Sequence, residues 1–301
     1  MTDAARDATA FADRLGRSFT DYGFAIIADH GIPQQLIDRA EAQARAFFAL
    51  PEETKRRYAL GQSGARGYTP FGIETAKGAA AHDLKEFWHV GRDLSDDHPF
   101  RQMMAANVWP AELPDFRATF LVLFEAFDRV GLTILAAIAR YLQLDEAYFT
   151  DTVRDGNSVL RLLHYPPQPE PTGEHIRAGA HEDINTITLL LGAEEAGLEL
   201  QTRDGRWIPV SPRPGELVVN IGDMLQRLTN GRLRSTPHRV VNPAPDRASH
   251  ARYSMPYFLH FRPDFVIEAL PGTVAPGEAP KWPAITAHDY LAERLREIKL
   301  A

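Results

Sequence analysis

The chain has 301 residues, of which 44% are hydrophobic and 24% charged, so it can bury a sizeable core and has the composition of a soluble globular protein. Its formal net charge of −7 argues against nucleic acid or an anionic membrane as the main partner, and the absence of cysteine excludes disulfides and thiolate chemistry. The N-terminus lacks the basic-then-apolar order of a signal peptide, and the most apolar run, residues 130–139, is too short to cross a bilayer. We therefore expect a cytoplasmic protein.

The first part of the chain is expected to be helical, with one short strand. Phe11, Leu15 and Phe19 recur every four residues, and this spacing predicts an amphipathic helix. A short apolar run follows that has the length of a strand. The predicted elements are, in order, a helix at residues 5–21, a strand at 24–28, a helix at 33–50 and a helix that begins at 51.

Residues 61–112 contain several glycines and prolines and no clear periodic pattern, so irregular structure is expected there. A stretch of this length without regular elements is more often functional than filler. Its aromatic residues Tyr68, Phe71 and Phe87 are interleaved with charged residues. Two interpretations are open. The stretch is either a loop that folds over its own aromatic side chains, or a wall of a substrate pocket formed by these three residues.

A long helix is predicted at residues 113–144, because its apolar residues keep a spacing of three to four. We expect these residues to pack as core against a sheet. Residues 1–150 would then form a mostly helical layer rather than a separate catalytic domain. No linker rich in Pro, Gly or Ser separates this layer from the rest, so we expect one continuous domain over residues 1–301.

From residue 158 the pattern changes to short extended runs that are separated by turn residues. The predicted strands are 158–165, 176–183, 186–191, 198–202, 207–210, 216–221, 234–241 and 252–261. Many short strands with turns between them indicate a sandwich or barrel, and about eight strands in two sheets make a jelly roll. The predicted fold class is therefore α+β with a mainly β core, a jelly roll over residues 158–264. A C-terminal helix at 285–298 is expected to pack on the helical layer.

Two histidines and one aspartate in this β region form a candidate metal site. On a strand, residues i and i+2 point to the same side, so His181 and Asp183 could bind one ion while Glu182 faces away. His238 is far enough along the chain to come from another strand, and Arg252 follows at the distance of a hairpin. Two histidines and one carboxylate with open positions suit a non-haem Fe(II) that activates O2. Alone, a His-x-acid motif is weak, since roughly one or two are expected by chance in a chain of this composition.

The stretch that begins at His181 resembles the Fe(II)- and 2-oxoglutarate-dependent dioxygenases, in the branch that is similar to isopenicillin N synthase. The family's His-x-Asp…His iron motif matches His181, Asp183 and His238. Its Arg-x-Ser motif for 2-oxoglutarate matches Arg252 and Ser254. The resemblance covers most of the chain. It implies a distorted double-stranded β-helix with the metal in its mouth.

The resemblance also implies a reaction and its cofactors. With Fe(2+), 2-oxoglutarate and O2, the enzyme would oxidise a small-molecule substrate and release succinate and CO2. Hydroxylation is the simplest outcome, and desaturation and ring closure are variants in the family. The family's Asn-x-Tyr, which helps to bind 2-oxoglutarate, matches Tyr165, but Leu163 stands where the Asn is common. Arginine is suited to the distal carboxylate of 2-oxoglutarate, because its fork forms two parallel charged hydrogen bonds.

Three functions are open at this point. The first is a 2-oxoglutarate-dependent oxygenase. The second is an oxidase of the same fold that does not consume 2-oxoglutarate, although Arg252 and Ser254 weigh against it. The third is a metal-bearing protein that binds a ligand without turnover. Asp223 follows a predicted strand and is expected to cap a short helix, with a contact to a metal ligand as the alternative.

Overall fold

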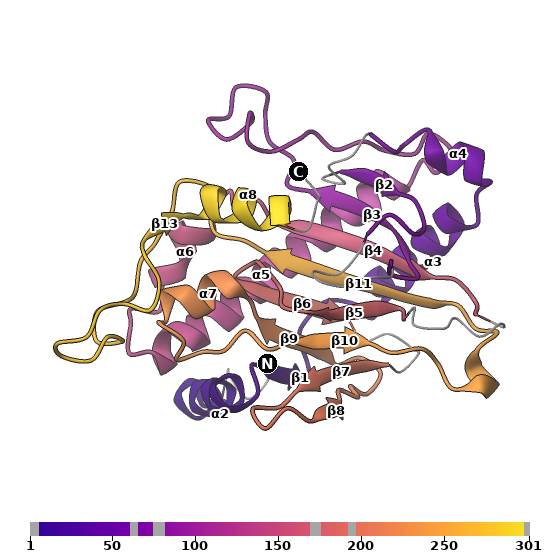
Figure 1. The fold of residues 1–301 in the computed structure, drawn as a ribbon. Helices are drawn as coiled ribbons and strands as arrows, with labels where there is room; N and C mark the ends of the chain where they lie inside the picture. Colours follow the sequence, from indigo (N-terminus) through magenta and orange to yellow (C-terminus); the bar gives the residue numbers. More distant parts are fainter. Residues whose placement is uncertain (1–5, 61–65, 75–81, 169–175, 192–196, 298–301) are drawn as a thin grey trace.

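Two β-sheets form the centre of the protein, and helices cover one of them (Figure 1). The computed structural model describes residues 6–60, 66–74, 82–168, 176–191 and 197–297. The strands of the two sheets are β1 (Phe24–Ile27), β2 (Gly67–Thr69), β3 (Glu86–Gly91), β4 (Val159–Tyr165), β5 (Ala178–His181), β6 (Ile187–Leu191), β7 (Leu198–Gln201), β8 (Trp207–Pro209), β9 (Leu217–Ile221), β10 (His238–Val240) and β11 (Arg252–Leu259). The larger sheet has seven strands in the order β1-β9-β6-β11-β4-β3-β2, and the smaller has four in the order β5-β10-β7-β8.

The two sheets form the expected jelly roll, with antiparallel pairing between neighbouring strands. Each of the extended runs predicted from residue 158 onward contains one strand, from β4 to β11. The strands are shorter than the runs that predicted them. This is expected, because residues at the ends of a run can resemble the strand in composition without pairing with a neighbouring strand.

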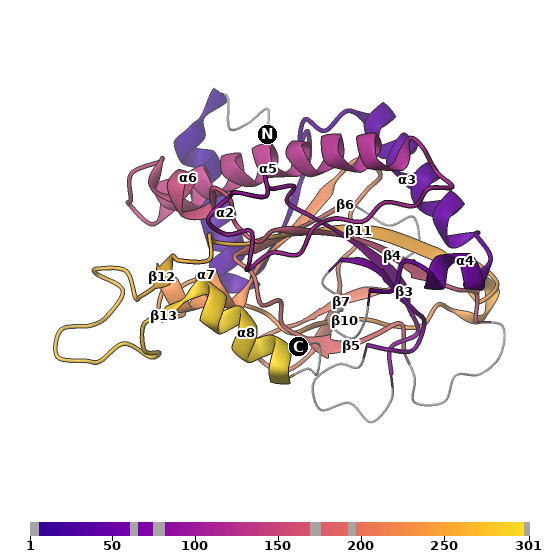
Figure 2. The same ribbon diagram turned by 90° about the horizontal axis from the view of Figure 1, so that it is seen from above.

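Helices lie on one side of the larger sheet, and Figure 2 shows α5 running along that side with α2 and α3 near it. The smaller sheet and the last helix lie on the opposite side (Figure 2). The remaining elements are α2 (Ala8–Asp21), α3 (Gln34–Phe48), α4 (Glu52–Arg56), α5 (Phe116–Tyr141), α6 (Tyr148–Val153), α7 (Asp223–Leu228), η1 (Pro245–Arg247), β12 (Val266–Ile267), β13 (Ile285–Thr286) and α8 (Ala287–Glu297). Among the described helices, none combines the length and the hydropathy that a membrane span requires.

Side chains of the larger sheet alternate between an outer face, toward α5, and an inner face, toward the smaller sheet. On β4, Leu160 and Leu162 belong to the main core that includes the buried side of α5. Leu163 and Tyr165 belong to a second cluster that includes residues of the smaller sheet. The outer face therefore supplies most of the buried apolar area, while the inner face is where polar residues can be brought together.

Helix α5 packs closely on β11 at Gly131. A Cβ atom at this position would lie only 2.4 Å from Cδ1 of the buried Leu259. Nearby, the ring of Tyr257 stacks on Phe127, with ring centroids 5.2 Å apart, and meets Phe124 edge-on at 4.9 Å. The predicted 113–144 helix is confirmed over Phe116–Tyr141, and this glycine allows it to approach the sheet.

The expectation that residues 61–112 are irregular is wrong for two segments, since β2 and β3 extend the larger sheet next to β4. Residues 61–65 and 75–81 of this stretch lie outside the described residues. Strand β3 was not predicted because charged residues surround Phe87, and charged residues are rare in a strand that is buried on both faces. In the structure these charges are paired. Glu86 accepts a hydrogen bond from Lys55 Nζ at 2.7 Å, and the Nδ1 atom of His164 lies 2.7 Å from its other oxygen.

The three aromatic residues considered for a substrate pocket lie in different environments. Tyr68 is buried on the outer face, where its ring meets Phe47 at 5.7 Å, so it does not share a face with the candidate metal ligands. Phe87 is buried on the inner face, in the same cluster as Tyr165. Phe71 is 43% exposed. The pocket interpretation is therefore corrected for Tyr68, because strand alternation directs its ring toward the helices.

The C-terminal helix α8 does not pack on the helical layer, contrary to expectation. It lies on the other side of the larger sheet (Figure 2) and contacts α7. The hydroxyl of Tyr290 donates to Asp223 at 3.1 Å, and the guanidinium of Arg227 lies 4.8 Å from the centroid of the Tyr290 ring. The small β12–β13 sheet precedes α8 and fixes its direction.

Replacement of Gly131 by Val should destabilise the protein by about 1–3 kcal/mol, the usual cost of overpacking a core. Valine has a better helix propensity than glycine, but that gain is at most about 0.5 kcal/mol, so overpacking decides the sign. The measurement is the urea midpoint of unfolding. Thr133→Val, at an exposed position on the same helix, controls for the β-branched side chain. Equal midpoints for the two variants would contradict the close packing described above.

Candidate metal centre

His181, Asp183 and His238 come together where the smaller sheet faces the larger one. His181 ends β5 and is paired with His238, the first residue of β10. Oδ1 of Asp183 lies 3.8 Å from Nε2 of each histidine. One ligand atom from each of the three residues lies within 4.8 Å of the others. The predicted set therefore converges on one point.

Asp183 does not share a strand with His181, contrary to our expectation. Strand β5 ends at His181, so Asp183 lies in the turn that follows and not on the strand. Side-chain alternation therefore does not place it. The turn after β5 fixes the position of Asp183 instead, because the backbone N–H of Asp223 donates to the carbonyl of Asp183 at 2.7 Å. Glu182 is exposed, as expected for a residue that faces away from the site.

Both histidines are held in the tautomer that a metal requires. Nδ1 of His181 lies 2.7 Å from the carbonyl oxygen of Gly179, and Nδ1 of His238 lies 3.1 Å from that of Thr236. A carbonyl only accepts, so each Nδ1 carries the proton and each Nε2 presents its lone pair. Burial lowers the pKa of His181 to about 4, and the neighbouring His238 acts in the same direction. The ring is therefore neutral near pH 7.

The carboxylate of Asp183 is oriented by two residues of the larger sheet. Thr188 Oγ1 donates to its Oδ2 at 2.5 Å, and Asn220 Nδ2 donates to the same oxygen at 2.7 Å. Both bonds use Oδ2, so Oδ1 is left toward the histidines. Burial alone would raise the pKa of Asp183, but the two histidines and these hydrogen bonds outweigh it and hold the pKa below its usual value. The carboxylate is therefore ionised.

Gly222 allows the turn that carries Asp183 to lie against α7. A Cβ atom on Gly222 would lie 2.1 Å from the backbone oxygen of Asn185. Gly222 is also the N-cap residue of α7, so the prediction that Asp223 caps this helix is wrong by one position. The carboxylate of Asp223 accepts from Tyr290 instead, and burial raises its pKa. The contact to the candidate ligand Asp183 is made by the backbone N–H of Asp223 and not, as the alternative expected, by its acidic side chain.

A series of polar contacts at the edge strand β5 holds His181 in position. Asp83 Oδ1 accepts from the N–H of Gly179 at 2.9 Å, and the carbonyl of the same glycine holds the His181 ring. Asp83 Oδ2 accepts from Lys85 Nζ at 2.8 Å, and Lys85 also lies 2.6 Å from Glu74 Oε2. Asp83 thus positions a candidate ligand without contacting the metal point itself.

Sequence reasoning did not identify Thr188, Asn220, Asp83 or Lys85. A signal was present for the first two, because both are polar residues within strands that are otherwise apolar. A buried polar residue on a strand needs a partner, and the partner here is Asp183. Asp83 and Lys85 gave no such signal, since they precede a strand that the sequence did not predict.

A second polar site lies on the inner face at one end of β4 and β11. Arg252 is paired with Tyr165, and Ser254 is paired with Leu163. Nη1 of Arg252 donates to Ser254 Oγ at 3.1 Å, and its guanidinium lies 5.1 Å from the centroid of the Tyr165 ring. These residues are buried. Because β11 belongs to the larger sheet and β10 to the smaller, the segment from His238 to Arg252 crosses between sheets and is not the expected hairpin.

The donor set has the chemistry that Fe(II) requires. Two imidazoles and one carboxylate are borderline-to-hard ligands, and three protein ligands leave positions for a chelating 2-oxoacid and O2. The buried guanidinium of Arg252 supplies a charge of the sign that a dicarboxylate needs at its distal end. The residues present therefore fit both groups.

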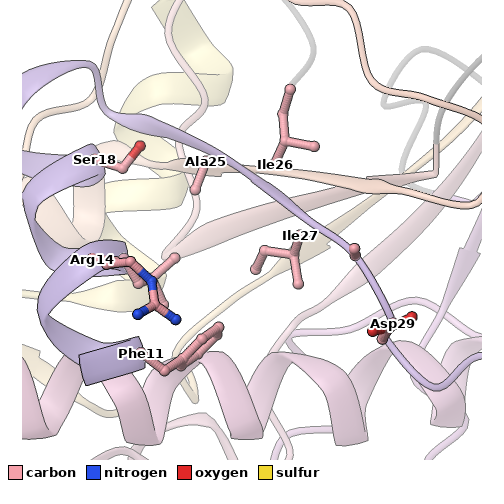
Figure 3. A pocket seen from close by; sticks show the side chains of 9 residues that line it. Phe11, Arg14, Ser18, Ala25, Ile26, Ile27 and Asp29 are labelled. Atoms are coloured by element: carbon pink, nitrogen blue, oxygen red, sulfur yellow. The ribbon is translucent and has the colours of Figure 1, made fainter. Parts of the chain in front are cut away.

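A surface hollow elsewhere in the protein contributes nothing to this centre. It lies between α2 and β1, has a volume of about 360 Å³, and is open to solvent (Figure 3). Phe11, Arg14, Ile26 and Asp29 are among its lining residues, and none of the candidate metal ligands is. We therefore place the chemistry at the inner face of the larger sheet.

Comparisons with known proteins agree with the site. The chain matches the model of the non-haem dioxygenase N-terminal region in morphine synthesis over residues 2–112, and that of the 2OG-Fe(II) oxygenase superfamily over residues 156–261. It is 37% identical to a 2-oxoglutarate-Fe(II) type oxidoreductase of Emericella nidulans, with 89% of this chain and 79% of that protein covered.

Solved structures agree as well. A Caulobacter crescentus protein assigned to the 2OG-Fe(II) oxygenase family has a TM-score of 0.93 and 56% identity, with 99% of this chain and 97% of that chain covered. A Neurospora crassa protein, solved at full length in complex with alpha-KG and thymine, has a TM-score of 0.86 and 31% identity, with 96% of this chain and 91% of that chain covered.

Asp83→Ala should weaken divalent-metal affinity by roughly 10- to 100-fold, the usual effect of removing a group that orients a ligand. The reason is that Gly179 loses its acceptor and the ring of His181 is held less firmly. Anaerobic titration with Fe(II) measures the effect. Glu182→Gln is the control, because it removes a charge beside the ligands from an exposed side chain. A larger loss in the control than in Asp83→Ala would show that the positioning runs through Glu182 instead.

Proposed function

The chain belongs to the 2-oxoglutarate- and Fe(II)-dependent oxygenases, which use O2 to oxidise a small molecule, and from this premise we propose a role for each residue of the site. His181, Asp183 and His238 bind the iron. Arg252 and Ser254 bind the distal carboxylate of 2-oxoglutarate. The observation that carries the proposal is the convergence of the three ligand atoms, with each Nδ1 atom engaged by a carbonyl so that each Nε2 is available.

The protein's own side chains prepare the reaction by position and charge. When bound, iron supplies the redox chemistry that couples O2 to the breakdown of the oxoacid into succinate and CO2. Thr188 and Asn220 keep the Asp183 carboxylate turned toward the metal, so coordination requires little rearrangement. Burial of Asp183 and His238 limits the access of water to the positions where O2 and substrate must meet.

The 2-oxoglutarate anchor depends on Arg252. Its guanidinium is held by Ser254 and lies over the Tyr165 ring, so it is oriented before the ligand arrives. Leu163, which is paired with Ser254, takes the place of the Asn that is common in the family. One polar contact to the co-substrate is therefore replaced by an apolar surface, and a larger share of the binding rests on Arg252.

Two other functions were open from the sequence. Neither an oxidase that does not use 2-oxoglutarate nor a binding protein without turnover is favoured, because the relatives are 2-oxoglutarate enzymes. The substrate is a small molecule, and we infer hydroxylation as the outcome. The Neurospora crassa relative was solved with thymine, and this supports a compact substrate of similar size for the present enzyme. That the protein binds neither nucleic acid nor a membrane stays a prediction from its net charge.

His238→Ala should abolish Fe(II)-dependent succinate formation, because it removes one of three protein ligands. The direct measurement is anaerobic Fe(II) titration, which should lose stoichiometric binding. His98→Ala is the control, since it removes a partly buried histidine that belongs to a different segment and lies 3.6 Å from Asp155. Stoichiometric Fe(II) binding by His238→Ala would sink the assignment.

Arg252→Lys keeps the positive charge but loses the two-pronged donor. Charged hydrogen bonds contribute about 1.5–3 kcal/mol, so the 2-oxoglutarate requirement should rise roughly tenfold to a hundredfold. Iron affinity should stay the same, because Arg252 is not a ligand. The readout is succinate formation against 2-oxoglutarate concentration. An unchanged dependence would place the co-substrate elsewhere and would favour the oxidase.

A further inference from the structure

Helix α7 is bonded to the two segments that carry Asp183 and His238. On one side it holds the turn after β5. The backbone N–H of Asp223 donates to the carbonyl of Asp183 at 2.7 Å, and that of Met224 donates to the carbonyl of Asn185 at 3.1 Å. Both donors belong to the first turn of α7, where backbone N–H groups have no partner within a helix. The turn that carries Asp183 therefore supplies the acceptors that the helix itself lacks.

On its other side, α7 holds the segment that leads into β10. Oε1 of Gln226 accepts a hydrogen bond from the backbone N–H of Ser235 at 2.9 Å. The carbonyl oxygen of the next residue, Thr236, lies 3.1 Å from Nδ1 of His238 and fixes the tautomer of that ring. Ser235 and Thr236 are both buried. Gln226 thus acts on His238 through the backbone, in the same way that α7 acts on Asp183.

The C-terminal part of the chain holds α7 in place, and Figure 2 shows α8 beside it. The hydroxyl of the buried Tyr290 on α8 donates to Oδ2 of Asp223 at 3.1 Å. The guanidinium of Arg227 lies 4.8 Å from the centroid of the Tyr290 ring, and its Nη2 donates to the carbonyl of Pro283 at 2.9 Å. These contacts join α8 and the loop before it to the helix that holds the two ligand segments.

The hold on α7 affects metal binding through preorganisation. An ion must bring three ligand atoms to one point, and each restraint that is present before the ion arrives lowers the cost of doing so. Asp183 lies in a turn and has no strand pairing to fix it, so its position depends on α7. His238 is also held by pairing with His181 and Leu200 on the neighbouring strands. A loosened α7 should therefore displace Asp183 more than His238.

We propose that Tyr290 and Gln226 are positioning residues for the metal centre, and that the C-terminal helix acts through α7 to set the metal affinity. Neither residue belongs to the ligand set. This inference rests on the proposed function, because it takes His181, Asp183 and His238 as the ligands. A merely structural role for the same contacts would stabilise the fold and leave the metal affinity unchanged, so the two roles can be separated by measurement.

The first test compares Tyr290→Phe with Tyr141→Phe in the full-length protein. Each variant removes one tyrosine hydroxyl with a contact of 3.1 Å, to Asp223 in the first case and to Thr20 in the second. The Thr20 contact joins α2 to α5 in the helical layer, on the other side of the larger sheet (Figure 2). Calorimetric titration with Co(II) and anaerobic titration with Fe(II) give the metal affinity, and thermal unfolding of the metal-free protein gives Tm.

Tyr290→Phe should weaken the affinity for both metals by roughly two- to tenfold, the effect of losing one hydrogen bond that is fully transmitted to the ligands. Tyr141→Phe should bind both metals as tightly as wild type, although the two variants should lower Tm by similar amounts. Wild-type metal affinity in Tyr290→Phe would overturn the proposal, whatever its Tm. Equal weakening of metal binding in Tyr141→Phe would also overturn it, since the effect would then follow from general loss of stability.

The second test compares Gln226→Met with Gln226→Glu. Methionine has a similar length but lacks the carbonyl oxygen that accepts from Ser235, whereas glutamate keeps an acceptor there. Gln226 is partly exposed, so the position accommodates a charge. Gln226→Met should weaken Co(II) affinity, by less than Tyr290→Phe does, because strand pairing also holds His238. Gln226→Glu should keep at least wild-type affinity. Equal weakening in the two variants, or none in Gln226→Met, would remove Gln226 from the proposal.

The same titrations separate this inference from the proposed function. If wild type bound neither metal, or if His238→Ala bound both as tightly as wild type, the ligand assignment and the proposed function would fail. If wild type bound the metals and His238→Ala did not, while Tyr290→Phe and Gln226→Met kept wild-type affinity, the positioning role alone would be wrong.

Discussion

The carboxylate of Asp183 is the point on which the site depends, because it joins the two sheets. Its residue follows a strand of the smaller sheet, whereas the hydrogen bonds from Thr188 and Asn220 that orient it come from the larger one. The two histidines that face it belong to the smaller sheet. Any change in the distance between the sheets would separate the carboxylate from its orienting groups or from the histidines. The packing of the jelly roll is thus also the geometry of the metal centre.

The sequence predicted the strands of the jelly roll well, because a short extended run between turn residues marks each one. It also predicted which residues converge, but not by the correct path. Asp183 was placed by strand alternation, yet a turn held by the backbone of Asp223 positions it. A local pattern cannot reveal such a contact, since the partner comes from a distant part of the chain.

The failures share a physical cause, which is that long-range pairing overrides local composition. Strand β3 was missed because Lys85 and Glu86 are typical of loops, and only the fold supplies their buried partners. Tyr68 was grouped with Phe87 by composition, although the two face opposite sides of the same sheet. Helix α8 was predicted correctly as an element, but its place depends on a contact between Tyr290 and Asp223 that no periodicity encodes.

The inner face carries two arginines, Arg161 and Arg252, that are held by different contacts. The Nη1 atom of Arg161 donates to the Glu74 carboxylate at 3.2 and 3.3 Å, so this cation has an anionic partner within the protein. Arg252 donates to the hydroxyl of Ser254 and lies over the Tyr165 ring. The proposed anchoring of the 2-oxoglutarate carboxylate therefore falls to Arg252, which these two contacts orient, while Arg161 is engaged by Glu74. Because Arg252 is paired with Tyr165, and Arg161 lies four residues before Tyr165 on the same strand, the two guanidinium groups occupy separate positions along the β4–β11 pair.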